Sequence, residues 1–438
     1  MQDADAIPPP TAAEASPGAS PQNPTPDQAV PGPRPGRPKR RAILPEELIG
    51  TEYVQLIEGH LQHLREAYDN PNRELHYDQY LSAYILAFYN ATVRSLRGVE
   101  DMSQIQSLQE LLGIQCVHRN TFSAASHLFD PKLLQPIIDD LRARVPRLKH
   151  EDPRLATILN SVVAADGSYF TIASHIAWAL HHHKRNGEVQ AEIRLNMQIR
   201  VLDGLPQNLS ISGQAQGNEA DAMRELLEAQ TVYVVDRHYV NFQFMKAVLD
   251  AHSDLVLRCR SDAPLFQAER ELPLSAEDRE HGVISDRMGH LPGWPQTGDA
   301  SRPRVREVTI LNAEKQEIVR IVTTLLDVPA AVIGLIYRFR WQVELFFRWL
   351  KVIACFEHLW AHTPNGLTIQ FYVAVIAVLL IYVRLGCRPS KYAFSLLSFV
   401  ASGQATLEEI LPILERRERE RALARAAQAR RKAQKTAK

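Results

Sequence analysis

The chain has 438 residues, 45% of them hydrophobic, which is long enough for two or three domains around a sizeable core. Its 50 basic and 50 acidic residues cancel, and its four widely spaced cysteines exclude a zinc ribbon and a disulfide framework, so a reducing cytoplasm is expected. The N-terminus lacks an apolar signal region and the chain lacks a Gly-x4-Gly-Lys phosphate loop, so we expect neither secretion nor a nucleotide cofactor.

The zero net charge hides two basic ends. Residues 33–41 carry five bases and no acid, and residues 415–438 carry ten bases and three acids. The remaining chain is therefore acidic, at about −12. Basic ends on an acidic body suit an enzyme whose clustered carboxylates bind cations and whose tails bind phosphates.

Residues 1–42 are rich in proline, alanine and small polar residues, so we expect a disordered tail. Within it, Pro33–Arg41 resembles an AT-hook, in which a Gly-Arg-Pro core lays arginines into the minor groove of A·T-rich DNA. That resemblance makes Arg37 a candidate DNA-binding residue. A generic basic linker is the alternative.

Residues 43–145 show helical patterns. Tyr77–Leu96 is predicted as one long helix and Ile105–Leu112 as another that ends at Gly113. Arg119–Leu141 is predicted as two short helices, each with a Ser or Asp available as a cap. The pattern fits either a DNA-binding region or an ordinary helical packing domain.

After Pro146 the pattern changes to alternating strands and helices. The order of three strands, a helix, a strand, a helix and a strand is that of a ribonuclease-H-like fold. The predicted strands are 161–166, 192–202, 209–212, 231–236 and 255–259, and the predicted helices are 219–230 and 240–251. The strand 192–202 alternates as a half-exposed strand should. His175 and His181–His183 are interpreted as surface residues because adjacent histidines on a regular element do not face one ion.

Two predicted strands end in an acid, Asp166 and Asp236. Each alone has a structural explanation, because Asp-Gly favours a hairpin turn and Asp236 could begin a turn or cap the next helix. Together with Glu344, they supply hard oxygen ligands from several elements at one edge of a sheet, which is what a divalent-cation site requires.

Between Asp236 and Glu344 lies more chain than one connection needs. Residues 260–326 begin as a polar region with proline and glycine, and then show two strands, 306–311 and 317–325, around a turn at 312–316. Farther on, Phe371–Val383 is too short an apolar run to span a bilayer, and is predicted as a buried core helix. From Thr406 the tail is predicted as a solvated, charged helix rich in arginine and alanine, with a role in dimerisation or DNA contact as the alternative.

Tyr337–Lys351 has no glycine or proline and is predicted as a helix of about four turns. Its polar residues share one arc: Tyr337, Arg340, Glu344, Arg348 and Lys351. Its apolar residues form a stripe that must be buried: Ile336, Phe339, Val343, Phe346, Leu350 and Ile353. A solvated face with ion pairs to Glu344 would also explain the arc.

The spacing Tyr-x2-Arg-x3-Glu-x6-Lys from Tyr337 to Lys351 resembles the YREK signature of bacterial DDE transposases in the insertion-sequence-four family. Trp341 after the motif arginine and the context VVDRHY at 234–239 are similar to that family too. The resemblance implies that Asp166, Asp236 and Glu344 form the DDE triad and bind two Mg²⁺ ions, with Mn²⁺ as a possible substitute. It further implies that Tyr337, Arg340 and Lys351 hold DNA phosphates, and Arg348 and Arg237 join them as candidate DNA-binding residues.

The fold implied is α/β: a ribonuclease-H-like catalytic core with a β-rich insertion, preceded by an all-helical DNA-binding region. The expected parts are a tail (1–42), a helical DNA-binding domain (43–145), the catalytic domain (146–259 and 327–386), the insertion (260–326) and a basic helical tail (387–438). By the same resemblance Arg119, Asn120, Ser123 and Ser126 are expected to meet DNA, and Trp294 is the one insertion tryptophan available to stack on a flipped base.

The function implied is cut-and-paste transposition of an insertion sequence by metal-dependent strand cleavage and strand transfer. The expected partner is double-stranded DNA, bound by a homodimer in the bacterial cytoplasm at the nucleoid, without a membrane. The alternatives are a non-catalytic DNA-binding protein descended from a transposase and a nuclease without strand transfer.

Overall fold

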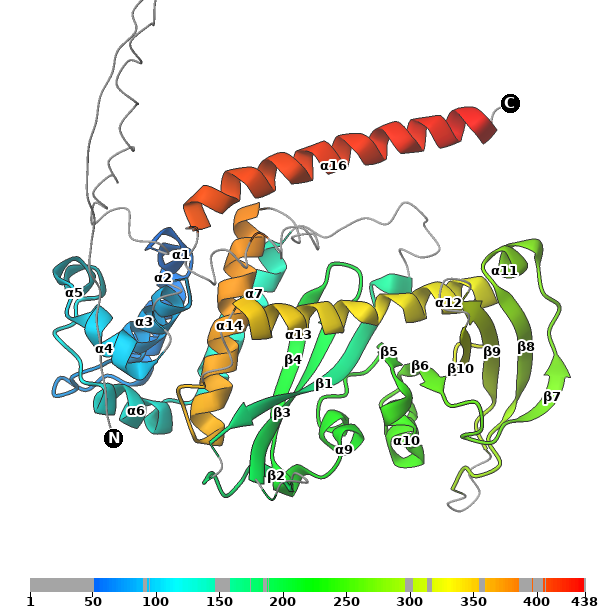
Figure 1. Ribbon diagram of the computed structural model, residues 1–438, viewed down its shortest axis with the longest axis horizontal. Helices are drawn as coiled ribbons and strands as arrows, with labels where there is room; N and C mark the ends of the chain where they lie inside the picture. The colour runs from blue at the N-terminus through cyan, green and yellow to red at the C-terminus, as the bar shows by residue number, and fades with distance from the viewer. Residues whose placement is uncertain are drawn as a thin grey trace, which may run out of the picture. The chain divides into compact units, whose positions relative to one another are not determined.

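The computed structural model describes residues 51–89, 93, 95–145, 158–173, 175–183, 187, 189–295, 302–312, 317–353, 359–385, 396, 405 and 407–436 (Figure 1). All of them belong to the unit Leu44–Lys438. The AT-hook-like stretch and Arg37 lie outside the described residues.

One mixed sheet of ten strands organises the structure, in the order β2-β3-β1-β5-β6-β10-β9-β8-β7, with β4 also paired to β3. The strands are β1 (Val162–Ile172), β2 (Leu180–His183), β3 (Val189–Arg200), β4 (Leu205–Ser212), β5 (Val232–Val235), β6 (Asp254–Cys259), β7 (Gln267–Glu271), β8 (Val283–His290), β9 (Val305–Asn312) and β10 (Glu317–Thr323). In the centre, β1, β5 and β6 run parallel, whereas β3 and β10 flank them antiparallel. The mixed α/β class predicted from the sequence is confirmed.

Strands from residues 260–326 extend this sheet. β10 pairs with β6, β9 with β10, β8 with β9 and β7 with β8. The two predicted strands are confirmed as β9 and β10, but β7 and β8 were missed. Gln267–Glu271 is exposed at every residue and carries three charges, so it has no apolar alternation from which to recognise a strand.

The sheet separates two hydrophobic clusters, because successive side chains on a strand point to opposite faces. On β1, Val162 and Ala164 belong to the cluster that contains helices α12 (Ala330–Phe339), α13 (Trp341–Ile353) and α14 (Pro364–Leu385). Val163 and Ala165 belong to the other cluster, with α9 (Glu219–Arg224) and α10 (Phe242–Asp250). β3 is buried along most of its length, so the prediction of a half-exposed strand is wrong.

The N-terminal helices pack around α14, and Figure 1 shows α3 and α7 beside it. They are α1 (Thr51–Gln55), α2 (Glu58–Ala67), α3 (Tyr77–Tyr89), α4 (Leu96–Ser103), α5 (Gln106–Leu112), α6 (Arg119–Leu128), η2 (Pro131–Leu134) and α7 (Gln135–Arg144). Gly113 ends α5 with φ of 59°, as predicted. The single predicted helix 77–96 is two helices, because Ser95 starts α4 by accepting a hydrogen bond from the Gly98 amide.

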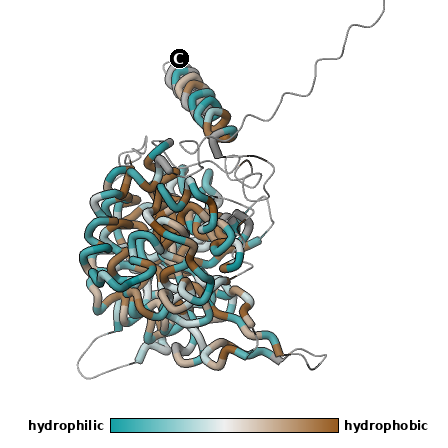
Figure 2. The backbone as a smooth tube through the Cα atoms, turned by 90° about the vertical axis from the view of Figure 1, so that its left-hand side faces the viewer, coloured by the Kyte–Doolittle hydropathy of each residue, from teal (hydrophilic) through white to brown (hydrophobic). Residues whose placement is uncertain are grey.

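Helix α14 is the buried core helix predicted from its apolar run. By length and composition Pro364–Arg384 could cross a membrane, but 83% of its apolar window is buried inside the protein. Figure 2 shows hydrophobic segments gathered inside the body, as a core helix requires. The remaining elements are η3 (Gln214–Gln216), η4 (Arg237–Tyr239), α11 (Ala276–Glu280) and α16 (Leu407–Thr436).

Candidate active site

Asp166 lies inside β1. The expectation that the strand ends there is wrong: β1 stays paired with β3 as far as Ile172. Its pairing with β5 covers only Val162 to Ala164, however, so Asp166 lies where the β5 side of β1 becomes free of backbone pairing. The Asp166 Oδ1 atom accepts a hydrogen bond from the Gly167 amide at 2.9 Å.

Asp236 directly follows β5, as predicted. Its side chain accepts a hydrogen bond from the His238 amide at 2.8 Å and so caps η4. Its second oxygen lies 2.9 Å from His238 Nδ1. The capping role predicted from the sequence is therefore present. Asp236 lies at the end of β5, the strand next to β1.

The motif segment is two helices rather than one. Arg340 lies between α12 and α13 with φ of −51° and ψ of −32°, and its amide donates to Tyr337 O, three residues back. The backbone at Arg340 therefore forms a tighter, 3₁₀-type turn and does not reverse its direction. The predicted apolar stripe remains buried on both sides of this point, at Ile336, Val343, Phe346 and Leu350. The side chain of Glu344 is 39% exposed, whereas that of Arg340 is 13% exposed.

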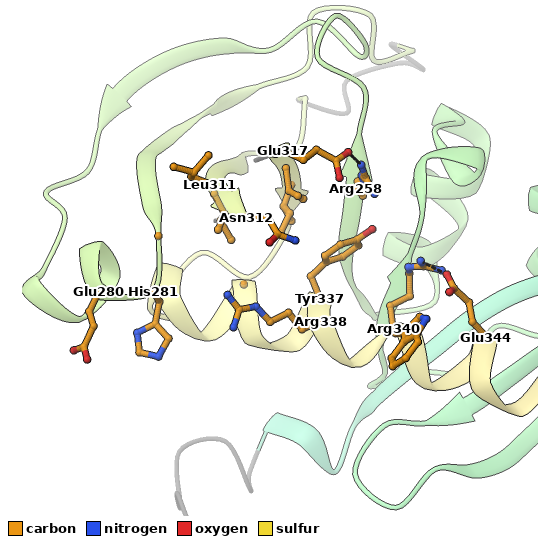
Figure 3. A pocket seen from close by; sticks show the side chains of 16 residues that line it. Arg258, Glu280, His281, Leu311, Asn312, Glu317, Tyr337, Arg338, Arg340 and Glu344 are labelled. Atoms are coloured by element: carbon orange, nitrogen blue, oxygen red, sulfur yellow. Dashed lines mark hydrogen bonds and ion pairs between the residues drawn. The ribbon is translucent and has the colours of Figure 1, made fainter. Parts of the chain in front are cut away.

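The Arg340 guanidinium joins two of the candidate acids. Its Nη1 lies 3.3 Å from Asp166 Oδ2. Its Nη2 donates to Glu344 Oε1 (Figure 3). Asp166 and Glu344 are far apart in the sequence, but both contact the same arginine side chain. Among the residues described here, no three His, Cys, Asp or Glu side chains are arranged ready to hold a metal ion.

Negative charge is concentrated around Asp166. Burial, followed by the charges of Glu219 and Asp236, raises the pKa of Asp166 to about 7, against the opposing effect of Arg340. Burial removes water from this acid, and the positive charge of Arg340 does not offset the combined effect of burial and the neighbouring acids. The donor set therefore fits a divalent cation, for which carboxylate oxygens are suitable ligands, and Asp166, Asp236 and Glu344 are the residues that would hold it.

Glu219 was not recognised from the sequence. It is the first residue of α9, after Asn218, whose side chain caps that helix. An acid in a first helical turn is ordinarily explained by the helix dipole, so nothing local distinguishes it.

The other predicted site residues differ in how far their side chains are exposed to solvent. Tyr337 is half-buried, while Arg348 and Arg237 are exposed. The Lys351 Nζ lies 5.0 Å from the centre of the Phe170 ring, and burial lowers its pKa.

A cavity of about 920 Å³ lies beside Glu344. Figure 3 shows it between α12 and the strands β9 and β10. Its lining includes Arg258, Arg338, Arg340, Tyr337 and Trp341. Three acids, Glu280, Glu317 and Glu344, also line the cavity, and Glu317 pairs with Arg258 as Glu344 does with Arg340. Guanidinium groups bind phosphates and aromatic rings stack on bases, so Arg338 and the two aromatic rings are the lining groups that suit a nucleic acid.

The four residues of the helical region that are expected to contact DNA differ in exposure. Arg119, Asn120 and Ser123 are exposed on α6. Ser126 is 3% exposed, and its carbonyl accepts a hydrogen bond from Asn365 Nδ2 at 2.8 Å, so it packs α6 against the start of α14. The cap of α6 also differs from the prediction, since the His118 side chain accepts from the Asn120 amide.

Trp294 lies against Phe242, with ring centres 5.8 Å apart in an edge-on arrangement. It is partly buried beside the cluster that covers α10. Its ring therefore contributes to packing.

Comparison with known proteins decides the family. Residues 158–380, just over half of the chain, match the family described as the transposase DDE domain. The chain belongs to the DDE transposase family. The match begins before Asp166 and ends after Glu344, so it contains all three candidate acids. Family membership supports a nuclease and transposase enzyme of the kind that uses divalent metal ions.

Three relatives have transposase names. The chain is 25% identical over 236 residues to transposase y4zB of Sinorhizobium fredii, covering 53% of this chain and 63% of that one, which is just under two thirds. It is 24% identical over 339 residues to a protein named as a transposase for insertion sequence element IS5377 of Geobacillus stearothermophilus, covering 77% of this DDE transposase and 83% of the relative. A protein named for insertion sequence element IS4SA of Synechocystis is 25% identical over 271 residues, covering 61% and 72%. These relatives and the family support the function of a DNA transposase of insertion sequences.

Proposed function

We propose that this DDE transposase is a member of the insertion-sequence-four group that moves its element by cut-and-paste, with Asp166, Asp236 and Glu344 as the metal-binding triad. The observation that supports it most is the position of Arg340, whose guanidinium contacts both Asp166 and Glu344. One guanidinium therefore draws both acids to the same place, where their side chains could turn to a divalent cation. The YREK spacing around Arg340 agrees with this assignment.

Two Mg²⁺ ions, or Mn²⁺ in their place, would activate water and neutralise the leaving oxygen. Water attacks the phosphorus at the element's end, the bond from phosphorus to the 3′ oxygen breaks, and that oxygen leaves as a 3′ hydroxyl. In strand transfer the same hydroxyl attacks a phosphodiester of the target DNA, and a target 3′ oxygen leaves. One phosphodiester replaces another, so the reaction needs no nucleotide cofactor.

The protein's own side chains position the DNA. In the metal-free state Arg340 neutralises part of the charge on Asp166 and Glu344. With divalent cations held by these acids, Arg340 would be available to a phosphate of the DNA end. Tyr337 and Lys351 would contact phosphates beside it, and the exposed Arg348 lies on the same helix as Glu344.

Double-stranded DNA is the proposed substrate, and two copies of the chain would act on the two ends of one element in the bacterial cytoplasm. The cavity beside Glu344, with Arg338 and two aromatic rings in its lining, is the proposed site for the DNA end. The exposed face of α6, with Arg119, Asn120 and Ser123, would contact DNA farther from the cleaved bond.

The test uses linear DNA that carries the inverted repeats flanking this reading frame. Purified protein with Mg²⁺ should cut at the repeat ends and join the freed 3′ ends to a second DNA, and Glu344→Gln should abolish both steps without abolishing binding. Binding without any cutting would indicate a DNA-binding protein, and cutting without joining would indicate a nuclease; either result would contradict the proposal.

A further inference from the structure

Glu219 reaches the active site from the face of the sheet opposite α13. Its carboxyl group lies over Gly167, where an added Cβ would be only 2.8 Å from Glu219 Cδ and 2.9 Å from Oε1. Any other residue at position 167 would therefore displace the carboxyl group. Because Gly167 directly follows Asp166, the missing side chain brings a fourth acid next to the candidate ligand.

The side chain of Glu219 is half-buried, and one of its two carboxylate oxygens is enclosed. Its Oε1 atom is inaccessible to water and has no hydrogen-bond partner in the part of the chain that the structure describes. No ion pair with Glu219 is formed by the described arginines, lysines and histidines either; Arg340 is occupied by Asp166 and Glu344. Leaving an enclosed carboxylate oxygen without a donor is unfavourable, so a missing positive partner for Glu219 is indicated.

A second polar group without a well-formed hydrogen bond to the described residues, the hydroxyl of the buried Tyr239, lies on the same side of the sheet. Tyr239 is 0% exposed, and its hydroxyl also has no partner that meets hydrogen-bond geometry among the described residues. Tyr239 lies in η4, which packs against α9, and after burial the charges of Glu219 and Asp166 are the main causes that raise the pKa of Tyr239. Glu219 and Tyr239 therefore approach Asp166 from the α9 side, each with a polar atom that lacks a well-formed hydrogen bond among the described residues.

We propose that Glu219 is a fourth carboxylate ligand of the divalent-cation site and shares a cation with Asp166. This assignment rests on the proposed function. With Arg340 turned to a phosphate, the three acids carry a formal charge of about −3, and Glu219 brings it to about −4, which matches the charge of two divalent cations. Tyr239 then positions Glu219 by donating its hydroxyl hydrogen to the ligand carboxylate.

The experiment measures Mn²⁺ binding directly. Full-length wild-type protein, Glu219→Gln and the control Asp221→Asn are titrated with Mn²⁺, and free Mn²⁺ is measured by electron paramagnetic resonance. Asp221 lies in the same first turn of α9, where it pairs with Arg224. Glu219→Gln should weaken Mn²⁺ binding by at least about tenfold, and Asp221→Asn should bind like the wild type.

Stability without metal separates a ligand from a structural residue. If Glu219 is a metal ligand that is unpaired in the metal-free protein, Glu219→Gln should leave the unfolding temperature in chelator unchanged or raise it. Unchanged Mn²⁺ affinity of Glu219→Gln, or a lower unfolding temperature in chelator, would overturn the assignment of Glu219. A wild-type protein that neither binds Mn²⁺ nor cleaves the element's ends would instead contradict the proposed function.

Discussion

Replacing Asp166 by asparagine should stabilise the metal-free protein at pH 8. Burial and the neighbouring acids raise the pKa of Asp166 from 3.8 to about 7. The folded state therefore binds this proton more tightly than the unfolded state, and stability falls as the pH rises from about 4 to about 7. A difference of about 3 pKa units at about 1.4 kcal/mol each gives an upper limit of about 4 kcal/mol, all of it present at pH 8.

Thermal unfolding in chelator measures this effect. For a chain of 438 residues the unfolding entropy is about 0.9 kcal/mol/K, so Asp166→Asn should raise the unfolding temperature by up to about 4 °C at pH 8. At pH 5 roughly a third of that gain should remain. Asp250→Asn, at an exposed ion pair with Lys246, is the control and should shift little at either pH.

Two results would refute this reasoning. A fall in the unfolding temperature of Asp166→Asn at pH 8 would mean that the contact with Arg340 outweighs the burial of the charge. An equal gain at pH 5 and pH 8 would mean that the ionisation of Asp166 is not its source.

Three further predictions concern other parts of the chain. Glu307→Gln should lower the free energy of unfolding by about 3–5 kcal/mol in denaturant titrations, because Glu307 is 1% exposed and pairs with two arginines; a loss below about 1 kcal/mol would contradict it. Gly282→Ala should cost at least about 1 kcal/mol in the same assay, since Gly282 has φ of +81° and a Cβ there would lie 2.7 Å from the Leu311 carbonyl oxygen; unchanged stability would show that the backbone relaxes. Arg119→Ala should weaken DNA binding in gel-shift titrations and reduce its salt dependence, whereas Ser126→Ala should leave both unchanged because Ser126 is buried; the reverse pattern would show that the faces of α6 are assigned wrongly.

The parts that were predictable from sequence have a local signal. Short apolar runs before Asp236 and around Asp166 identify buried strands, and the stripe from Ile336 to Leu350 identifies the face that packs on the core. The fifteen-residue spacing in the motif segment led to Arg340 and Glu344. The structure brings those two residues together with Asp166.

The missed features depend on contacts between distant segments. β1 continues through Asp166 because β3 supplies backbone partners, which a local Asp-Gly signal does not show. β7 is a strand of exposed polar residues that forms by pairing with β8. Glu219 reaches the site only because Gly167, far away in the sequence, leaves space for it. Such contacts are decided by tertiary packing and have no periodicity in the sequence.

The location of bound cations tests the central claim most directly. Crystals of the protein with an element-end DNA and Mn²⁺ should give anomalous scattering peaks among the carboxylates of Asp166, Asp236 and Glu344, with Arg340 turned away from Asp166 toward a phosphate. Manganese bound elsewhere, while Arg340 still joins Asp166 to Glu344, would contradict the assignment of these three acids as the metal-binding triad.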